Sequence, residues 1–492
     1  MASKNAKFLA IFGATLVSAA LFYFGTGLHP MWWLTWFAPL PILYLAGRDR
    51  AEISSAALAL AAFAALALAG LNMWHYLRAL IGVPVAVSLL AVAAPAAVFA
   101  VGVLLWRIFL LRGKAWHAAL FFPVFWTGIS YLSSLDSPHS TFGNLAYTQM
   151  NFLPLIQIAA MTGIWGIVFL LWLLPSSIGV FLSPAAESRS KERLIVSVTF
   201  VFAIVLIAGA WRLRSPMLIS GAARVQLISS DAPQDIFAVN DERALSLISR
   251  YADAVPAASS QPADVILLPE KIAKISEAAA GKAKDDLAAA AQRSGADLIV
   301  GLDELTLGGR RNEALLFGSN GSIQENYEKH HFIPVLEDGY VTGKNYVTFE
   351  RPSGIWGIAI CKDMDFPGLG RAYGRLGVGL LLVPAWDFTI DGWLHDRMAI
   401  LRGVEGGYTI ARTAKQGLQT VSDSRGRLLL DRRVFREGFV VSSVSVPVAH
   451  EDTLYDRWGD WFAWLCCAAL VGLLALLASF MMGRPGESGQ KK

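Results

Sequence analysis

Long runs without a charged side chain constrain this sequence more than any other feature. Such runs cover residues 8–47, 53–71, 82–106, 115–135, 154–182, 194–211 and 461–482. A helix of about 20 apolar residues crosses a membrane core roughly 30 Å thick. Because Gly27-Leu28-His29-Pro30 divides the first run into 8–27 and 31–47, the sequence predicts eight transmembrane helices. The first helix lacks a small-residue cleavage pattern before a polar stretch, so we expect it to be retained.

The charged residues define a second part of the chain. Of the 492 residues 55% are hydrophobic and 16% are charged, and residues 1–212 carry only 17 of the charged ones. Most of the others lie within 213–458, which predicts one large water-soluble domain there. We therefore divide the chain into a membrane domain (1–212), a soluble domain (213–458) and a last helix with its tail (459–492). The net charge of +4 without a long basic run gives no indication of nucleic acid binding.

The basic residues between the helices predict an orientation. Lys and Arg residues precede the first helix, follow the second and occur at 107–114, 189–193 and 484–492. All these segments fall on one side if the N-terminus is cytoplasmic, as the positive-inside rule requires. The soluble domain then lies on the opposite face, which is periplasmic for the inner membrane of a bacterium with two membranes. Arg212 and Arg214 would lie on the periplasmic side, against this rule. A large translocated domain tolerates such positive charges.

Three residues of the soluble domain suggest catalysis. Glu270 ends the apolar run 265–269, Lys329 lies within 327–334, and Cys361 follows the apolar run 355–360. A carboxylate, an ammonium and a thiol at the rim of a sheet can form an activated nucleophile with an oxyanion partner. Taken singly, the cysteine can be a buried small residue, the glutamate a surface carboxylate and the lysine a solvated side chain.

The remaining cysteines and the histidines do not predict a disulfide or a metal site. Cys466 and Cys467 are adjacent in the last apolar run, and Cys361 has no cysteine partner in the soluble domain. His330 and His331 would point to opposite faces of a strand, and His395 is distant in sequence. We expect no metal and no cofactor.

The soluble domain alternates short β-rich runs with helical ones. We expect helices over 241–255, 278–294 and 394–406, a hairpin turn at 318–322, and strands over 223–229, 265–268, 298–301, 314–317, 355–360, 379–383, 408–413 and 439–446. This alternation is typical of an α/β sandwich.

Glu270, Lys329 and Cys361 resemble the Glu-Lys-Cys triad of the nitrilase (carbon–nitrogen hydrolase) superfamily, which has an α-β-β-α sandwich. With the surrounding helices, nearly the whole chain resembles the apolipoprotein N-acyltransferase family. The stretches 144–163 and 393–413 are similar to that family's signatures, and Glu337 stands where the family has a second glutamate. Two positions depart from the family pattern. Lys362-Asp363 follows the cysteine in place of an aromatic residue and Glu, and Leu268-Pro269 precedes Glu270 in place of Trp-Pro.

The resemblance implies a two-step acyl transfer through a thioester. Cys361 would take an acyl chain from a phospholipid, and the N-terminal amine of diacylglyceryl-cysteine on an apolipoprotein would then receive it. Glu270 would act as general base and Lys329 would stabilise the oxyanion, with the backbone N–H of Lys362 as a second donor. Glu337 would orient Lys329 or the amine, and Asp363 would replace the family's Glu.

Several aromatic residues are candidates for substrate binding. Trp386, Phe388 and Trp393 follow a predicted strand and can line an acyl-chain site or simply pack in a loop. Tyr147 lies in the uncharged stretch 137–151, which is either a surface loop or a loop beneath the active site that gives lipid access.

The sequence leaves two other functions open. Water in place of the amine would make the protein a membrane-tethered carbon–nitrogen hydrolase, or amidase, and Lys362-Asp363 favours this alternative. A catalytically silent lipid-binding scaffold is the third possibility, which the intact triad disfavours. For the transferase, the expected partners are the bilayer, a phospholipid donor and an apolipoprotein acceptor, with the protein acting as a monomer.

Overall fold

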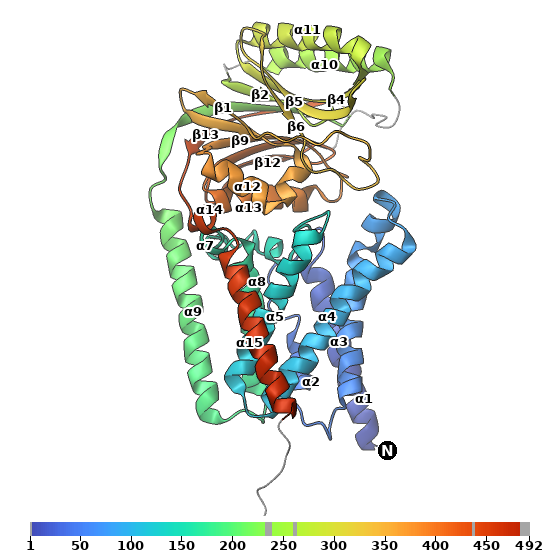
Figure 1. Ribbon diagram of the computed structural model, residues 1–492, viewed down its shortest axis with the longest axis vertical. Helices are drawn as coiled ribbons and strands as arrows, with labels where there is room; N and C mark the ends of the chain where they lie inside the picture. Colours follow the sequence, from blue (N-terminus) through green and yellow to red (C-terminus); the bar gives the residue numbers. More distant parts are fainter. Residues whose placement is uncertain (1, 232–238, 259–262, 435–437, 483–492) are drawn as a thin grey trace, which may run out of the picture. The chain divides into compact units, whose positions relative to one another are not determined.

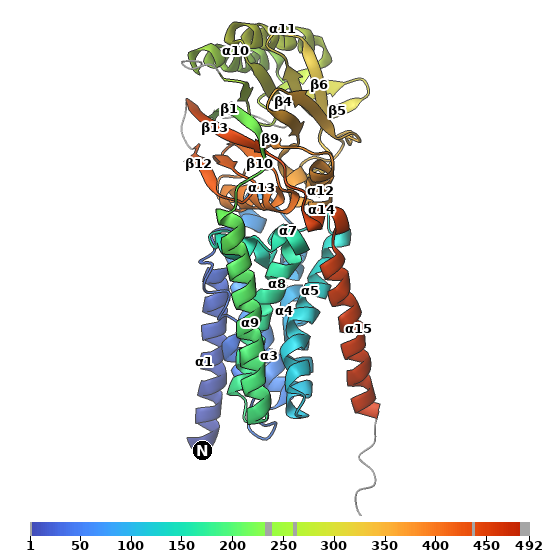
Figure 2. The ribbon, with the colours of Figure 1, turned by 90° about the vertical axis from the view of Figure 1, so that its left-hand side faces the viewer.

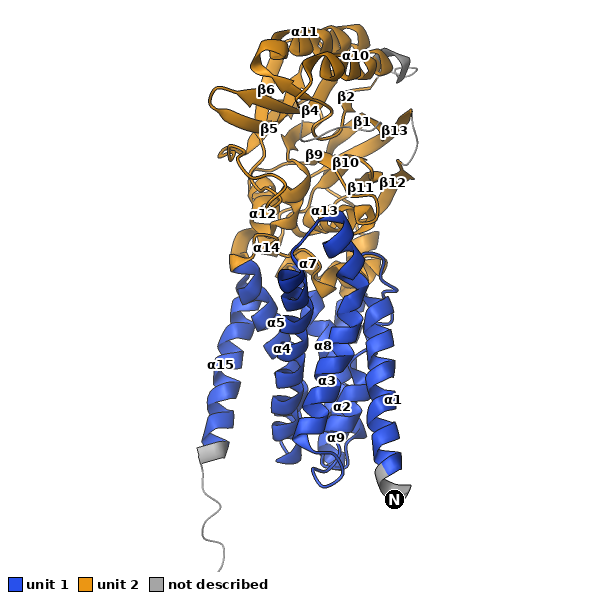
Figure 3. Ribbon diagram, turned by 90° about the vertical axis from the view of Figure 1, so that its right-hand side faces the viewer, with its two compact units in different colours: residues 1–135, 164–207, 460–492 blue, residues 136–163, 208–459 orange. Residues whose placement is uncertain are grey.

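The computed structural model describes residues 2–231, 239–258, 263–434 and 438–482 (Figure 1). The chain forms two compact units, coloured separately in Figure 3. Unit 1 comprises residues 1–135, 164–207 and 460–492, and unit 2 comprises 136–163 and 208–459. Unit 2 therefore includes the uncharged stretch 137–151, which the sequence division assigned to the membrane domain.

Unit 1 is built from long apolar helices, which run alongside one another in Figures 1 and 2. Within the described residues, seven helical segments are long and apolar enough to cross a membrane: Asn5–Gly25, Ser55–Met73, Val85–Leu111, Ala115–Asp136, Ile164–Leu182, Ser188–Arg214 and Trp461–Phe480. The helices themselves are α1 (Ala2–Gly25), α2 (Leu40–Ala46), α3 (Ser55–Gly70), α4 (Val85–Leu111), α5 (Ala115–Asp136), α8 (Ile164–Leu182), α9 (Ser188–Arg214) and α15 (Trp461–Met482), with short turns η1 (Leu71–Met73) and η2 (Tyr76–Leu80) between α3 and α4.

One predicted span is not a full helix. Residues 31–47 contain only the seven-residue helix α2, preceded by a series of turns. Pro39 and Pro41 explain the difference, because proline lacks the N–H that an interior helix bond needs. The predicted fold class is confirmed, with seven candidate spans among the described residues in place of eight.

The start of another span also differs from the prediction. The apolar run 154–182 is divided into α6 (Leu153–Ile156), α7 (Ala159–Thr162) and α8. Gly163 separates α7 from α8 with a φ of +63°, and a Cβ at this position would lie 2.5 Å from the ring of Tyr455. Only glycine suits both this backbone conformation and this close approach.

Unit 2 contains two β-sheets. The first has the strand order β13-β1-β2-β4-β5-β6, with β3 also paired to β4, and the second has the order β12-β11-β10-β9-β8-β7. The strands are β1 (Ile219–Ser230), β2 (Val265–Leu267), β3 (Lys274–Ser276), β4 (Asp297–Thr306), β5 (Gly309–Phe317), β6 (Ile323–Glu328), β7 (Val347–Arg351), β8 (Gly354–Ile358), β9 (Leu380–Trp386), β10 (Thr409–Lys415), β11 (Leu418–Ser422), β12 (Leu428–Arg433) and β13 (Phe439–Ala449).

Helices cover the outer faces of the two sheets. The helices of unit 2 are α10 (Asp241–Ala258), α11 (Glu277–Ser294), α12 (Pro367–Arg375), α13 (Gly392–Gly406) and α14 (Leu454–Trp458), with short turns η3 (Leu145–Gln149) and η4 (Cys361–Asp365). In Figure 1, α10 and α11 lie beyond the first sheet, and α12 and α13 lie beyond the second. Unit 2 is therefore the α-β-β-α sandwich that the sequence analysis expects.

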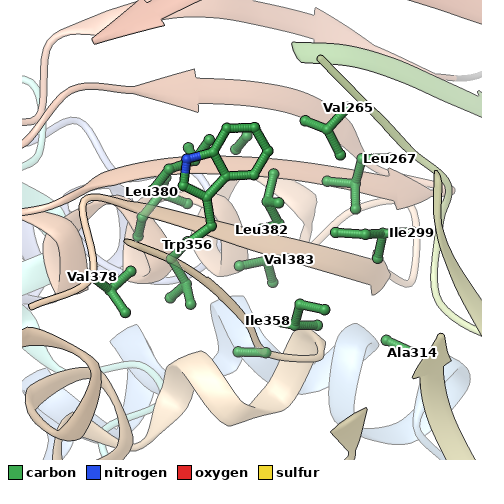
Figure 4. Packing of buried hydrophobic residues seen from close by; sticks show 14 of the residues in the cluster. Val265, Leu267, Ile299, Ala314, Trp356, Ile358, Val378, Leu380, Leu382 and Val383 are labelled. Carbon is green, nitrogen blue, oxygen red and sulfur yellow. The ribbon is translucent and has the colours of Figure 1, made fainter. Parts of the chain in front are cut away.

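The core between the two sheets is almost entirely apolar. Val265, Leu267 and Ile299 of the first sheet face Trp356 and Leu382 of the second (Figure 4). All five side chains are essentially inaccessible to solvent. Burying side chains of this size contributes about 1.5–3 kcal/mol each, so this layer fixes the two sheets against each other.

The strand directions gather the ends of several strands at one edge. β1, β2 and β4 are mutually parallel, as are β8, β9 and β10. β6 runs parallel to β4, because both strands pair antiparallel with β5. Glu270 follows β2, Lys329 follows β6, and Cys361 follows β8. Three residues far apart in sequence can therefore meet at the same rim.

Candidate active site

Glu270 is positioned by contacts to both sheets. Its backbone N–H donates to the carbonyl of Ala385 at 3.2 Å, which joins the end of β2 to β9. A Cβ on Gly301 would lie 2.5 Å from the Glu270 Cα, so the neighbouring strand must present a glycine here. The carboxylate of Glu270 is buried, with only 2% of the residue exposed.

Lys329 lies between two carboxylates. Its Nζ donates to Glu270 Oε1 at 2.8 Å and to Glu337 Oε2 at 2.9 Å, and the residue is fully buried. Burial acts to lower the pKa of this ammonium, but Glu270 and Glu337 outweigh it and raise the pKa well above its ordinary value. Lys329 therefore stays positively charged and fixed in place.

Glu337 is an ionised anchor for this lysine. Burial acts to raise its pKa, yet Lys329 and Lys271 together lower it to about 2. Lys271 Nζ also contacts Glu337 directly, and the backbone N–H of Ile333 donates to Glu337 Oε2 at 2.8 Å. A carboxylate with so low a pKa is a weak proton acceptor at neutral pH.

Asn312 links the two carboxylates, a contact that the sequence analysis missed. From β5, its Nδ2 donates to Glu270 Oε1 at 2.7 Å and to Glu337 Oε1 at 3.1 Å. Its backbone carbonyl accepts from the N–H of Lys329 at 2.9 Å. Asn312 thus contacts three of the site residues, and both it and Lys271 belong to the site. Arg311 and Glu313 flank Asn312 in the sequence, so no local pattern marked it as a site residue.

Cys361 occupies a strained turn after β8. Its φ of +43° lies in the left-handed region, which is unfavourable for a residue with a Cβ. Its thiol donates to the carbonyl of Trp386 at 3.4 Å. Burial raises the pKa of the thiol well above its ordinary value, and Glu270 adds to this effect while Lys329 opposes it. The resting nucleophile is therefore a neutral thiol that is influenced electrostatically by both charged groups and needs a base.

Asp363 holds the nucleophile turn against the segment that carries Lys329. Its Oδ2 accepts from the Ile360 N–H at 3.1 Å and from the Tyr327 hydroxyl at 2.7 Å. Its Oδ1 accepts from the N–H groups of His330 at 3.2 Å and His331 at 2.9 Å. The carboxylate fixes the position of Cys361 relative to Lys329.

Lys362 does not point freely into solvent. Its Nζ donates to Asp365 Oδ2 at 3.0 Å and lies 3.3 Å from the ring Nδ1 of His139. Only 4% of the residue is exposed. The cation beside the nucleophile is therefore paired with a carboxylate.

The four residues predicted to bind substrate differ in how deeply they are buried. Trp386 is half-buried beside the nucleophile, and Lys415 Nζ lies 3.6 Å from the centre of its ring. Phe388 and Trp393 are half-buried on the following loop and at the start of α13. Tyr147, in contrast, is fully buried, and its hydroxyl is bonded to Thr141 Oγ1 at 2.6 Å. The suggested place of Tyr147 at a lipid-facing surface does not agree with this burial.

Substitution of Asn312 tests whether this residue positions the site carboxylates or only supports the fold. Asn312→Ala removes the amide that donates to Glu270 and Glu337, so thioester formation should slow by about 10- to 100-fold. Rates of acylation of the purified protein test this effect.

Asn326→Ala is the matched control for this variant. Asn326 lies in β6, and its Nδ2 donates to Glu313 Oε2 at 2.8 Å. It loses the same kind of contact outside the site and should be acylated at the wild-type rate. An unchanged acylation rate in Asn312→Ala would leave Asn312 with a purely structural role.

Comparison with known proteins places this geometry in a class. Residues 222–428 match the family described as carbon-nitrogen hydrolase, and residues 18–177 match the apolipoprotein N-acyltransferase N-terminal domain. The sandwich with its glutamate, lysine and cysteine is therefore a carbon–nitrogen hydrolase domain, here attached to a membrane-spanning unit.

Named relatives extend the similarity over most of the chain. An apolipoprotein N-acyltransferase of Geobacter metallireducens is 26% identical over 389 residues, which are 72% of this chain and 73% of the relative. One of Rhodopseudomonas palustris is 25% identical over 457 residues, 84% of this chain and 81% of the relative. Among solved structures, an amidase from Nesterenkonia sp. covers 51% of this chain and 99% of its own at 22% identity, with a TM-score of 0.40.

The two domain matches and the relatives agree on one family. This chain belongs to the apolipoprotein N-acyltransferases, and it is an acyltransferase enzyme.

Proposed function

We propose that this protein transfers an acyl chain from a phospholipid to the N-terminal amine of diacylglyceryl-cysteine on apolipoproteins. The observation that carries the proposal is the buried cluster of Glu270, Lys329 and Cys361 in a chain with membrane-spanning helices. The cluster supplies a base, a fixed positive charge and a nucleophile. The membrane-spanning helices hold the enzyme in the bilayer, where both lipid substrates are.

The first half-reaction forms a thioester. Glu270 accepts the proton of the Cys361 thiol, and the sulfur attacks the ester carbonyl carbon of the phospholipid. Lys329 Nζ and the backbone N–H of Lys362 stabilise the negative oxygen of the tetrahedral intermediate. The carbon–oxygen ester bond then breaks, and Glu270 returns its proton to the leaving oxygen of the lysophospholipid.

The second half-reaction transfers the acyl group to nitrogen. The neutral amine attacks the thioester carbon, and Glu270 accepts a proton from the attacking nitrogen. The carbon–sulfur bond breaks, and this proton returns to the sulfur of Cys361. Glu337 keeps Lys329 oriented in both steps, since its pKa of about 2 makes it a weak base. Asp363 holds the Cys361 turn, and Trp386, Phe388 and Trp393 are our candidates for acyl-chain contacts.

Intact-protein mass spectrometry tests the proposal and separates it from the hydrolase alternative. Incubation with a phospholipid alone should add the mass of one acyl chain to the protein. Addition of a synthetic diacylglyceryl-cysteine peptide should then remove that mass and produce an N-acylated peptide. Release of free fatty acid with no acylated peptide would instead identify a hydrolase, and no acyl adduct at all would leave only a scaffold.

We also propose that the catalytic domain, residues 213–458, faces the periplasm, with residues 1–212 and 459–492 serving the inner membrane. The support is that Lys and Arg residues occur at the N-terminus and in the turns after α2, α4 and α8. Lys7 Nζ donates to the carbonyl of Ala51 at 3.4 Å, so residues 26–47 return the chain to the side of the N-terminus although α2 is short. The turns after α2, α4 and α8 line one cavity and therefore share that side. We also propose that the protein acts as a monomer.

Cysteine labelling gives a direct prediction for this orientation. Leu307 in the β4–β5 turn is 99% exposed, and Arg189 lies at the start of α9. A membrane-impermeant maleimide should label Leu307→Cys in bacteria whose outer membrane alone has been made permeable. Arg189→Cys should react only after the inner membrane is opened. The parent protein measures the background from its own three cysteines, and equal labelling of both sites would rule out the orientation.

A further inference from the structure

Unit 1 contains a cavity of about 640 Å³ at the turns where three of its helices end. The turn after α2 contributes Asp49 and Arg50, the end of α4 contributes Ile108 and Arg112, and the turn after α8 contributes Pro184. Apolar and cationic side chains thus share one cavity. Such a mixed lining suits a ligand that has both an anionic and an apolar part.

The charges at the cavity are predominantly positive. Arg50 makes no ion pair within the described part of the chain, and Asp49 is the one carboxylate among the lining residues. Arg112 Nη2 donates to the carbonyl of Phe480 at 3.3 Å. Its other N–H groups remain available to a ligand. The positive charge of the two guanidinium groups therefore exceeds the negative charge of the single carboxylate.

Arg107 adds a third guanidinium close to this lining, although it is not one of the lining residues. It precedes Ile108 on α4, only 1% of it is exposed, and its Nη2 donates to the carbonyls of Arg48 at 3.1 Å and Ile53 at 2.7 Å. These bonds hold the side chain against the turn that carries Arg50. Its Nε and Nη1 are buried and have no hydrogen-bond partner. This buried guanidinium with two unpaired donors adds positive charge near the lining arginines.

The helix ends themselves do not decide the sign of the ligand. The carbonyl end of a helix carries about half a negative charge, and the following amide end carries about half a positive one. Each turn at the cavity joins the end of one helix to the start of the next, so these contributions largely cancel. The arginine side chains therefore determine what the cavity attracts.

We propose that this cavity binds the phosphodiester group of an anionic phospholipid. Arginine matches the oxygens of a phosphate better than any other side chain, because its N–H groups form a planar fork. Basic pockets between membrane helices bind anionic lipid head groups, and the apolar wall suits the glycerol and the first acyl carbons. All the cavity residues belong to unit 1 and all the proposed catalytic residues to unit 2. The proposal therefore uses none of the proposed catalytic residues and does not rest on the proposed function.

The test uses the full chain in a non-ionic detergent and an ether-linked phosphatidylglycerol. This probe has no ester carbonyl, so it cannot acylate Cys361. Native mass spectrometry should detect a bound lipid in addition to any lipid held at the donor site, and the occupancy of this additional lipid should fall at least about tenfold in the double variant Arg50→Gln/Arg112→Gln. Arg189→Gln/Arg193→Gln is the matched control, since it removes the same charge from exposed positions outside the lining. It should bind as the wild type does.

Two competition experiments show whether the site binds a phospholipid or a free phosphate ester. Diacylglycerol, which lacks the phosphate, should not compete with the probe. If soluble glycerol 3-phosphate competes at similar concentrations, the site binds a free phosphate ester and the lipid assignment is wrong. Equal loss in both double variants, or no loss in either, overturns the site itself. Arg107→Gln should weaken binding further, and circular dichroism establishes whether that variant is folded before its result is used.

Discussion

Cys361→Ala should form no thioester with phospholipid and should lose more than about a thousandfold in turnover, because no other group at the site is a comparable nucleophile. Cys361→Ser should be nearly as inactive, since the surroundings that raise the thiol pKa disfavour a hydroxyl anion even more. Mass spectrometry of the intact protein after incubation with phospholipid measures the adduct directly.

The fold should survive this substitution. Only 6% of Cys361 is exposed, and removing one sulfur from a buried position costs about 1 kcal/mol. Cys466→Ala is the matched control, because it makes the same change at a buried cysteine in α15. It should acquire the acyl mass at the wild-type rate. An acyl adduct on Cys361→Ala would refute the covalent mechanism.

The fold was predictable where physical constraints act locally. Uncharged runs are set by bilayer thickness, so six of the predicted spans have clear counterparts, and a seventh, 154–182, begins later than predicted. Hydropathy alone could not distinguish 31–47 from a full helix, because Pro39 and Pro41 change backbone bonding and not apolarity. Strands β3, β6, β7, β11 and β12 were not predicted. β6 and β12 are partly or largely exposed and show no apolar alternation, so local hydropathy does not mark them.

The site was predictable only in part, for a similar reason. Glu270 and Cys361 were found because each directly follows an apolar strand-like run. Asn312 was missed because its role depends on pairing of β4, β5 and β6, which brings it to Glu270 across 42 positions of sequence. The burial of Tyr147 depends likewise on residues distant in sequence, such as Arg402, whose Nη2 lies 3.2 Å from its hydroxyl.

Substitution of Glu270 separates its two expected roles, which are to accept the thiol proton and to act on the thiol pKa through its negative charge. Glu270→Gln keeps an oxygen that can accept from Asn312 and Lys329, so the local geometry should remain. It cannot accept the thiol proton, and thioester formation should slow by about 100- to 10,000-fold. At the same time the negative charge that raises the thiol pKa is gone, so the thiolate should form at lower pH.

Two measurements on the same variant therefore move in opposite directions. Acylation by phospholipid, followed by intact mass, should nearly disappear in Glu270→Gln. Alkylation of Cys361 by iodoacetamide, which needs only the thiolate, should have its pH midpoint shifted downward from that of the wild type. Glu337→Gln is the control, since Glu337 is expected to orient Lys329 and not to move protons. It should slow acylation only about tenfold. If Glu270→Gln acylates as fast as the wild type, the base that activates Cys361 is another carboxylate. Glu337, with a pKa of about 2, and Asp363, whose oxygens already accept several hydrogen bonds, are the remaining candidates.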